Sequence, residues 1–150
     1  MPKIQTIISD SSSATYNSGL TFAKILKAGD KILLLGDIGS GKTTFVQGMA
    51  RFLGITQAVQ SPTFVLLKPY RIPKNRGKSK ASSFIHLDLY RLGNTDDLQE
   101  LGFAELLDDK KAIICIENPI KNLPFIGRKY TVSFFYLNQN RRKIRITLTK

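Results

Sequence analysis

The chain has 150 residues, of which 42% are hydrophobic, which is enough for one domain with a single sheet and helices on both faces. No apolar stretch approaches the roughly 18 residues that a membrane-spanning helix needs, and the N-terminus lacks the basic and apolar regions of a signal peptide. We therefore expect a cytoplasmic protein without membrane contact. The single cysteine, Cys115, lies in an apolar run and is expected to be a small core residue.

The formal net charge of +12 is concentrated in two segments. Residues 68–80 contain six basic residues and no acid, and residues 128–150 contain seven basic residues, again without an acid. Such segments fit contact with the phosphates of a nucleic acid, here through the basic loop and a C-terminal hairpin. Solvated loops, or a generally basic proteome, would give the same pattern, so both interpretations stay open.

The first predicted elements are a short strand at 4–8 and a helix that begins at the serines 11–13 and ends at Gly29. Residues 32–35 then form a continuous apolar run, which is typical of a parallel strand buried on both faces. The glycine-rich segment that follows therefore comes directly after a strand.

Residues 36–43 read Gly-Asp-Ile-Gly-Ser-Gly-Lys-Thr, which is the G-x-x-x-x-G-K-[ST] pattern of a phosphate-binding loop. Apolar residues at helical spacing from 46 to 53, followed by Gly54, predict that the loop opens a helix. The glycines allow positive φ angles, and the helix N-terminus adds partial positive charge. The expected nucleotide-binding residues are Gly36, Asp37, Ile38, Gly39, Ser40, Gly41, Lys42, Thr43 and Thr44.

Three polar residues at the end of the loop and the start of the helix have expected partners in a bound nucleoside triphosphate and its Mg²⁺. Lys42 is expected to reach the β- and γ-phosphates, and the Thr43 hydroxyl is expected to bind Mg²⁺, which prefers oxygen ligands. Thr44 is a candidate for the α-phosphate. The alternative is a glycine-rich turn that binds nothing, but a buried Lys42 beside the helix N-terminus would then lack an anion.

The middle of the chain alternates turn signals with apolar runs. Ser61-Pro62-Thr63-Phe64 interrupts the chain, and residues 68–83, rich in Lys, Pro, Gly and Ser, are typical of a mobile basic loop. A strand at 84–87 precedes Asp88, and an acidic helical stretch at 96–109 follows, with early acids that suit a helix N-terminus.

The C-terminal part contains a third buried strand at 112–116, which precedes Glu117 and the turn Asn118-Pro119. A hairpin follows, with strands around a turn at 138–140. Alternating strands and helices predict an α/β fold of the P-loop NTPase type in a single domain, 1–150. We expect a three-layer sandwich with a mainly parallel central sheet, flanking helices and a C-terminal β-hairpin.

Two carboxylates follow the predicted strands. Asp88 and Glu117 each come just beyond an apolar strand, as Gly36 does, so all three are expected at one edge of the sheet. In phosphoryl transfer one carboxylate holds Mg²⁺, directly or through water, while a second group orients the attacking water. A solvated residue at a strand end is the alternative for each. His86 either positions Asp88, contacts a partner, or is simply hydrogen-bonded inside the fold.

Four motifs in this order resemble the TsaE (YjeE) family. They are Gly36 to Thr43, Ser61-Pro62-Thr63-Phe64, His86-x-Asp88-x-Tyr90-Arg91 and Ile116-Glu117-x-Pro119. The resemblance implies a small ATPase needed in bacteria for the threonylcarbamoyladenosine modification of tRNA. It also implies TsaD and TsaB as partners, with ATP binding and hydrolysis resetting their complex between turnovers. With this resemblance, tRNA becomes the candidate nucleic acid for the basic loop 68–80 and the hairpin.

The resemblance carries over onto matching positions. Lys42 and Thr43 would serve phosphate and Mg²⁺, Glu117 is similar to the family's metal-site glutamate, and Asp88 resembles its catalytic carboxylate. Lys42, Asp88 and Glu117 are thus the expected catalytic residues, and Thr43, Asp88 and Glu117 are the candidates for Mg²⁺.

Two further positions bear on this resemblance. Ser61 and Thr63 lie in a switch-like segment, where Thr63 would sense the γ-phosphate. The chain departs from the family at Asn118, where a Trp is usual, so a contact made by that ring is not expected here.

Two other function classes remain open on the sequence alone. A small-molecule kinase uses a similar phosphate loop, but it needs an arginine-bearing lid, for which residues 68–83 are the only candidate. A nucleotide-dependent binding module without turnover would use Lys42 but would not need Glu117 for hydrolysis.

Overall fold

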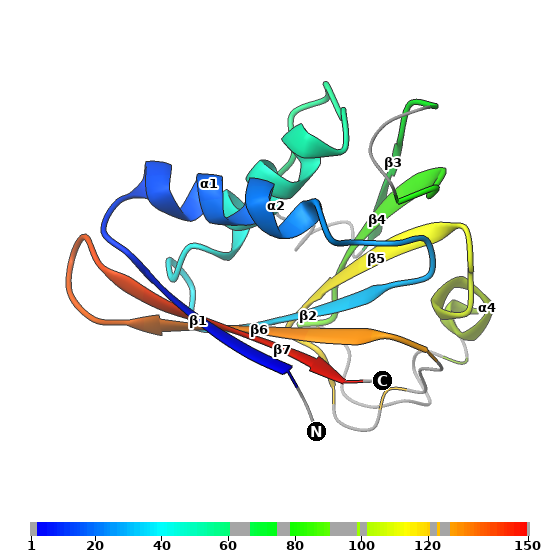
Figure 1. Ribbon diagram of the computed structural model, residues 1–150. Helices are drawn as coiled ribbons and strands as arrows, with labels where there is room; N and C mark the ends of the chain where they lie inside the picture. Colours follow the sequence, from blue (N-terminus) through cyan, green and yellow to red (C-terminus); the bar gives the residue numbers. More distant parts are fainter. Residues whose placement is uncertain are drawn as a thin grey trace.

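The computed structural model describes residues 3–60, 67–74, 79–90, 99, 102–120, 123 and 127–149. Within these residues the chain forms a seven-stranded sheet in the order β1-β7-β6-β2-β5-β4-β3, with helices packed against it (Figure 1). The strands are β1 (Lys3–Ser9), β2 (Lys31–Leu35), β3 (Leu67–Arg71), β4 (Ser83–Asp88), β5 (Ala112–Glu117), β6 (Lys129–Tyr136) and β7 (Arg142–Thr149). The described helices are α1 (Ser12–Ala23), α2 (Lys42–Phe52) and α4 (Phe103–Leu107).

The sheet is mixed, with a parallel centre. β2 pairs in parallel with both β5 and β6, and β4 pairs in parallel with β5. The outer strands β1, β7 and β3 are antiparallel to their neighbours, and β6 and β7 form the C-terminal hairpin. The predicted α/β fold with a mainly parallel central sheet and a C-terminal hairpin is therefore confirmed.

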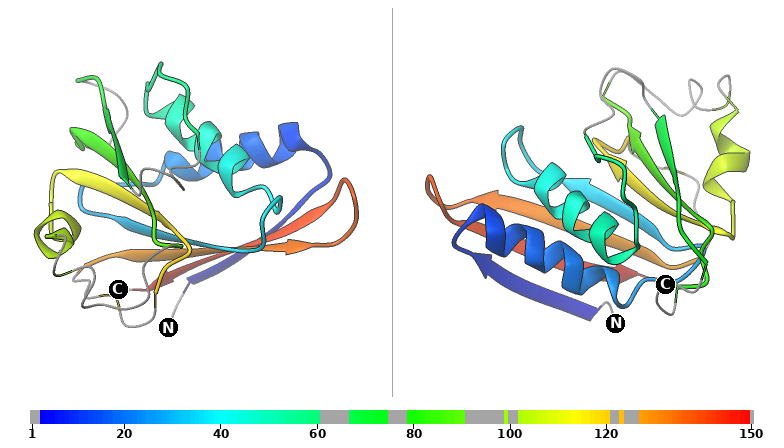
Figure 2. Two further views of the ribbon diagram at one scale, coloured as in Figure 1. Left: turned by 180° about the vertical axis from the view of Figure 1, so that it is seen from behind. Right: turned by 90° about the horizontal axis from the view of Figure 1, so that it is seen from above.

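Helices α1 and α2 lie side by side over one face of the sheet, whereas α4 lies on the other side beside β5 (Figure 2). Ser11 caps α1, because its Oγ accepts a hydrogen bond from the Ala14 N–H at 3.0 Å. The predicted helix end at Gly29 is wrong, because α1 stops earlier and the chain turns. In that turn the Asp30 carboxylate accepts a hydrogen bond from the Lys27 N–H at 2.8 Å.

Glycines set the distance between α1 and α2. A Cβ at Gly19 would overlap the carbonyl oxygen of Phe45, and a Cβ at Gly48 would overlap that of Tyr16. Each helix therefore brings its backbone against the backbone of the other, which only glycine permits at these two positions.

The apolar core has two parts, one on each face of the sheet. The larger part lies between the sheet and the pair α1 and α2, and includes Phe22, Phe45 and Phe134. The smaller part lies between the sheet and α4. Cys115 on β5 is fully buried in the larger part, and burial raises the pKa of its thiol well above 9.0, so the predicted core role is confirmed.

The prediction of a loop over 68–83 is wrong at both of its ends. β3 covers 67–71 and pairs with β4, which begins at Ser83. Lys68 and Pro69 are tolerated because β3 is an edge strand, while Tyr70 is buried. The connection is also anchored, since the Ser79 carbonyl accepts a hydrogen bond from the Ala28 N–H at 2.7 Å.

Some predicted elements differ in extent or lie outside the described residues. Asp88 and Glu117 are the last residues of their strands rather than the residues just beyond them. Within the acidic helical stretch predicted at 96–109, the structure describes the helix α4. The segment 61–66, which contains Ser61-Pro62-Thr63-Phe64, lies outside the described residues. None of the described helices combines the length and apolar character needed to cross a membrane.

Candidate nucleotide-binding site

The glycine-rich loop lies between the end of β2 and the start of α2. Gly36, Gly39 and Gly41 have φ angles of 149°, 79° and 104°, which L-residues with side chains rarely adopt. At Gly36 a Cβ would also lie 2.7 Å from Ser40 Oγ and 3.1 Å from the Phe134 carbonyl oxygen. The loop therefore turns back toward the helix N-terminus, where successive N–H groups form a concave surface for an anion.

Lys42 folds back over this loop. Its Nζ donates a hydrogen bond of 2.6 Å to the Gly36 carbonyl oxygen, and the residue is 7% exposed. This charge-assisted bond holds the ammonium group over the loop and next to the helix N-terminus. Ser40 Oγ is also buried there and has no hydrogen-bond partner among the described residues. The loop thus concentrates donors that suit phosphate oxygens.

Asp88 and Glu117 lie side by side at the ends of β4 and β5, where they are register partners. Asp88 Oδ1 accepts hydrogen bonds from the Tyr90 N–H at 2.9 Å and from Asn118 Nδ2 at 3.0 Å. Asn118 has a φ of 50°, a left-handed conformation that asparagine tolerates better than most residues. This backbone turn directly after β5 brings the Asn118 amide to the carboxylate of the neighbouring strand.

His86 contacts Glu117 rather than Asp88. Its Nε2 lies 3.0 Å from Glu117 Oε1, and both side chains are buried. His86 Nδ1 has no hydrogen-bond partner among the described residues. Of the interpretations raised by the sequence, the structure supports a histidine hydrogen-bonded inside the fold, and its contact with Glu117 also restricts the rotamer of that carboxylate.

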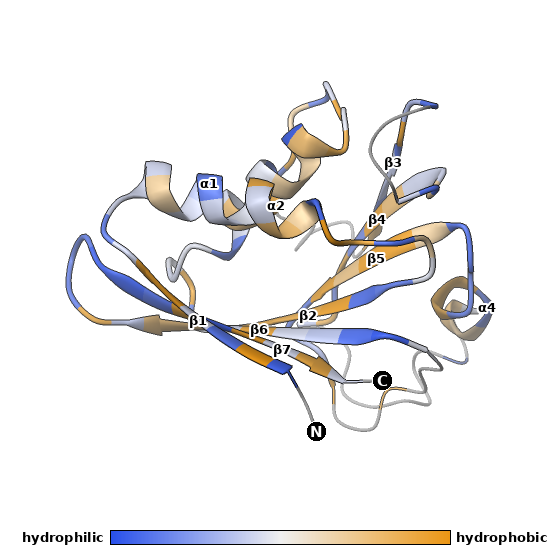
Figure 3. Cartoon of the chain, in the orientation of Figure 1, coloured by the Kyte–Doolittle hydropathy of each residue, from blue (hydrophilic) through white to orange (hydrophobic). Residues whose placement is uncertain are grey.

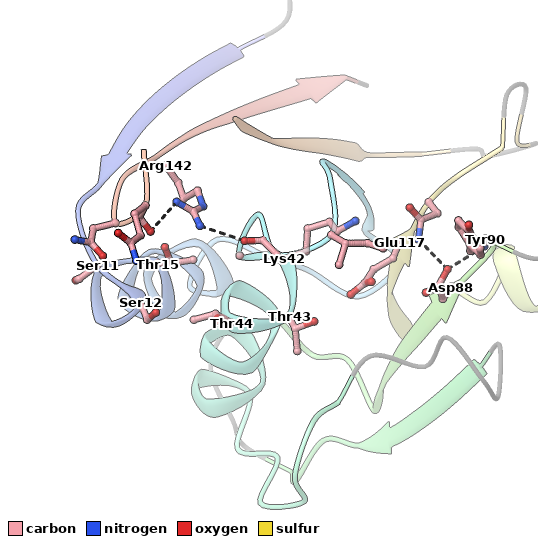
Figure 4. A pocket seen from close by; sticks show the side chains of 16 residues that line it. Ser11, Ser12, Thr15, Lys42, Thr43, Thr44, Asp88, Tyr90, Glu117 and Arg142 are labelled. Carbon is pink, nitrogen blue, oxygen red and sulfur yellow. Dashed lines mark hydrogen bonds between the residues drawn. The ribbon is translucent and has the colours of Figure 1, made fainter. Parts of the chain in front are cut away.

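Lys42, the two carboxylates and Asn118 line one pocket, which has a volume of about 580 Å³ (Figure 4). Lys42, Thr43 and Thr44 lie in its middle. We call one side the carboxylate end, which consists of Asp88, Tyr90, Glu117 and Asn118. We call the other side the hairpin end, which consists of Ser11, Ser12, Thr15, Gln139, Asn140 and Arg142. The pocket therefore extends from the ends of the parallel strands, past the loop, to the turn between β6 and β7.

Arg142 connects the hairpin end to the loop. Its Nη2 donates a hydrogen bond of 3.2 Å to the Gly39 carbonyl oxygen, and its Nη1 donates one of 2.7 Å to the Asn138 carbonyl oxygen. The guanidinium also lies 4.7 Å from the centroid of the Tyr136 ring. The turn of the hairpin is thus tied to the tip of the glycine-rich loop, although 103 residues separate Arg142 from Gly39.

The donor set fits Mg²⁺ that is bound together with a nucleotide. Among the described residues there is no group of three or more His, Cys, Asp or Glu side chains that could hold a metal ion. Thr43, Asp88 and Glu117 instead offer hard oxygen donors along one wall of the pocket. Mg²⁺ in nucleotide sites takes one or two protein oxygens, and phosphates and water complete its octahedron.

The structure places most of the predicted site residues around this pocket. Gly39, Gly41, Lys42, Thr43 and Thr44 line it together with the two carboxylates, and Ile38 at the loop tip is 97% exposed. Asp37 is exposed beside Ile38. The predicted switch residues Ser61 and Thr63 lie outside the described residues.

Sequence reasoning did not predict the contacts of Asn118 and Arg142, nor the hairpin end as a whole. For Asn118 a signal existed, because Asn-Pro marks a turn and asparagine is enriched at positive φ. No sequence pattern could show that Ser11, Thr15 and Arg142 line the same end of the pocket, because this depends on how the hairpin lies beside the start of α1.

Comparisons with known proteins identify the family and the fold of the chain. The family model described as "Threonylcarbamoyl adenosine biosynthesis protein TsaE" matches residues 9–145. The protein of that name from Aquifex aeolicus is 31% identical over 148 residues, which cover 97% of this chain and 98% of the relative. The one from a Nostoc species is 46% identical over 82 residues, and the match covers 53% of this chain and 44% of that relative.

The fold has a solved counterpart. The crystal structure of Bacillus subtilis YdiB superposes with a TM-score of 0.76 at 25% sequence identity, over 100% of this chain and 88% of that one. Both the family match and the fold extend well beyond the glycine-rich loop, and they include the two carboxylate-bearing strands. The chain belongs to the TsaE family.

Proposed function

We propose that this protein binds ATP with Mg²⁺ and hydrolyses it to ADP and phosphate in support of the threonylcarbamoyladenosine modification of tRNA. The observation that carries the proposal is the pocket itself. A phosphate loop with Lys42 folded over it faces two carboxylates at the ends of parallel strands. The relatives are named as proteins of tRNA threonylcarbamoyladenosine biosynthesis, and these names support the biological process that we propose.

Each residue has one task in this proposal. The N–H groups of residues 36–43 and the Lys42 ammonium bind the β- and γ-phosphates and stabilise negative charge as it shifts during hydrolysis. Thr43 and Glu117 hold Mg²⁺, which supplies neutralisation of phosphate charge when it is bound. Asp88 orients the attacking water.

Contacts around the two carboxylates support their assignment to different tasks. His86 fixes Glu117 through a buried hydrogen bond, which is typical of a residue that supports a metal ligand. Asp88 is fixed by two donors on a single oxygen, from the Tyr90 backbone and the Asn118 side chain. Both carboxylates are thus oriented before a nucleotide arrives, which reduces the reorganisation needed for catalysis.

The resemblance to TsaE proteins also supports TsaD and TsaB as partners in the cytoplasm, with nucleotide hydrolysis resetting their complex. The direct test combines the purified chain with TsaD, TsaB and tRNA and follows ATP hydrolysis and repeated rounds of modification. We expect several turnovers with the chain and about one round without it. Modification that continues equally well without the chain would refute this role.

The site assignment is tested by Glu117→Ala. We expect hydrolysis to fall at least about 100-fold, because the proposed ligand of the Mg²⁺ that stabilises the transferred phosphate is lost. Binding of ADP without Mg²⁺ should stay within about threefold of the wild type, because the phosphate contacts of Lys42 and the loop are intact. Hydrolysis that survives both Glu117→Ala and Lys42→Ala would place the chemistry elsewhere.

The kinase alternative loses support from the structure. Its only lid candidate was the segment 68–83, and β3 and the start of β4 occupy both ends of that segment. The described basic residues of β3, Lys68 and Arg71, are exposed on an edge strand. A tRNA contact through residues 68–80 remains a prediction, and the salt dependence of tRNA binding after their replacement by serine would test it.

A further inference from the structure

The strands β1, β7 and β6 present a second face that points away from α1 and α2. Residues such as Val132, Phe134, Ile144 and Ile146 face the helices and belong to the large core. Because side chains alternate along a strand, their neighbours point to the opposite side. Cross-strand registers align these neighbours in two rows, Ile8 with Lys143 and Phe135, and Thr6 with Arg145 and Ser133. We call these six residues the open face.

The open face lies beyond the part of the sheet that α4 covers. The small core under α4 is built from β4 and β5 residues, with Leu33 of β2 packed against it. Figures 1 and 2 show α4 beside β5, away from β1 and β7. Ile8 is 49% exposed and Phe135 is 37% exposed, so apolar side chains of this face remain in contact with solvent.

The charge of this region has one sign. None of the strands β1, β2, β6 and β7 contains an Asp or a Glu, whereas Lys143 and Arg145 lie in the middle of the open face. Figure 3 shows hydrophilic and hydrophobic segments alternating along β1 and β7. Arg141 and Arg142 follow at the hairpin turn, where Arg142 also lines the nucleotide pocket. A surface with cations and no carboxylate favours a polyanionic ligand.

The aromatic ring of Phe135, on the β6 side of the open face, lies beside the two cations of β7. Lys143 Nζ lies 4.8 Å and the Arg145 guanidinium carbon lies 5.2 Å from the centroid of the Phe135 ring. These contacts orient the ring and keep both charges beside it. An exposed ring flanked by cations on a sheet surface is the arrangement with which proteins stack unpaired bases and neutralise the adjoining phosphates.

We propose that the open face binds single-stranded RNA, with a base stacked on Phe135 and adjoining phosphates paired with Lys143 and Arg145. An RNA ligand fits better than a protein partner, because protein interfaces are depleted in lysine, whereas RNA supplies negative charge along its whole length. This site is separate from the nucleotide pocket, so the inference goes beyond the proposed ATPase. Arg142, which reaches Gly39, connects the two regions.

The test uses the full chain and a fluorescein-labelled RNA hairpin with a single-stranded loop, followed by fluorescence anisotropy from about 50 to about 200 mM salt. The double substitution Lys143→Ser/Arg145→Ser should flatten the slope of log affinity against log salt by about 1.4. Phe135→Leu, which keeps an apolar side chain, should weaken binding about tenfold with the slope unchanged. The matched control, Lys110→Ser/Lys111→Ser, removes two exposed charges elsewhere and should leave the slope within about 0.3.

Three results would overturn the inference. One is an equal loss of slope in the control, which would indicate diffuse attraction by the net charge. Another is equal affinity for a fully paired RNA of the same length, because no base would then be available to Phe135. The third is unchanged RNA binding by both open-face variants together with lost association with TsaD and TsaB, which would make the open face a protein-docking surface. Thermal unfolding of each variant controls for folding, and ATP hydrolysis by the isolated chain should be unaffected.

Discussion

The two ends of the nucleotide pocket are built in different ways. The carboxylate end consists of residues at the tips of β4 and β5, where Asp88 and Glu117 are buried and held by hydrogen bonds. The hairpin end consists of a helix N-terminus and a turn, and its Arg142 is held mainly by backbone carbonyl oxygens. Strand ends fix a side chain through the register of the whole sheet, whereas a turn holds it through a few local bonds.

Because of this difference, we expect the carboxylate end to carry out hydrolysis. We expect the contact of Arg142 at the hairpin end to be less rigid. Catalytic groups lose rate steeply when they shift by about 1 Å, so they belong on the more rigid support. The helices α1 and α2 join the hairpin end to the middle of the pocket, because α1 begins at the hairpin end and α2 begins at the loop. Three changes test this arrangement and a fourth serves as a comparison away from the pocket, from the largest expected effect to the smallest.

Lys42→Ala should have the largest effect. It removes the ammonium group from the middle of the pocket, and we expect affinity for ADP to fall about 10-fold to about 100-fold, since a charged hydrogen bond is lost. The matched variant at the hairpin end, Arg142→Ala, should lower affinity less than about threefold, because that guanidinium is held by backbone carbonyl oxygens. Isothermal titration calorimetry compares both. Equal losses would contradict the division between the ends.

Gly48→Ala tests the contact between α1 and α2, which joins the hairpin end to the middle of the pocket. Replacing an exposed helical glycine by alanine raises the free energy of unfolding by up to about 1 kcal/mol. At Gly48, however, the added Cβ would overlap the Tyr16 carbonyl oxygen. We expect the free energy of unfolding to fall by about 1 to about 3 kcal/mol, because the helices must move apart. Urea unfolding measures it, with Asn17→Ala on the exposed side of α1 as the control. A stabilised Gly48→Ala would show that the helices separate without cost.

Asn118→Gly tests the support of Asp88. Glycine tolerates the φ of 50° but removes the amide that donates to Asp88, so the backbone turn is kept while one hydrogen bond is lost. We expect the rate constant of hydrolysis to fall about fivefold, with the affinity for ADP unchanged. An equal fall in ADP affinity would indicate that Asn118 contacts the nucleotide instead of positioning Asp88.

The smallest effect is a pH dependence that arises away from both ends. Asp30 lies at the opposite end of β2 from the loop, and burial raises its pKa above the ordinary 3.8. The folded state therefore binds this proton more tightly than the unfolded state. The resulting stabilisation is complete below the unfolded pKa and is lost as the pH rises through the folded pKa.

Asp30→Asn removes this titration. We expect the unfolding free energy of the variant, relative to the wild type, to increase between about pH 3 and about pH 6. ADP affinity measured over the same interval should keep the same ratio between the two proteins. A difference in stability that does not change with pH would show that the Asp30 carboxyl titrates normally.

Much of the fold could be predicted from the sequence because its central elements carry strong local signals. β2 and β5 are continuous apolar runs, and the glycine pattern before α2 has a single structural interpretation. The edge strand β3 was missed because lysine, proline and arginine at 68–71 are typical of a loop. Such residues are acceptable in a strand only when its outer side is unpaired, and this depends on the sheet order.

The candidate site was likewise predictable only in part: its residues could be predicted, but their contacts could not. Residues within the glycine-rich pattern or at strand ends, such as Lys42 and Glu117, follow from local pattern and topology. The contacts of His86 with Glu117 and of Asn118 with Asp88 depend on the register of β4 against β5, which a one-residue shift would change. The contact of Arg142 with Gly39 depends on how the hairpin lies over the loop, and no sequence spacing encodes that distance.

The buried position of Cys115 has a practical consequence for measuring nucleotide binding. Thiol reagents require an accessible thiolate, and this thiol is fully buried with a raised pKa. The natural chain therefore already serves as a background for site-specific labelling, without removal of its own cysteine. A cysteine placed at exposed Gln139 in the hairpin turn would be the reactive one, and a fluorophore there would report nucleotide arrival at the pocket in real time.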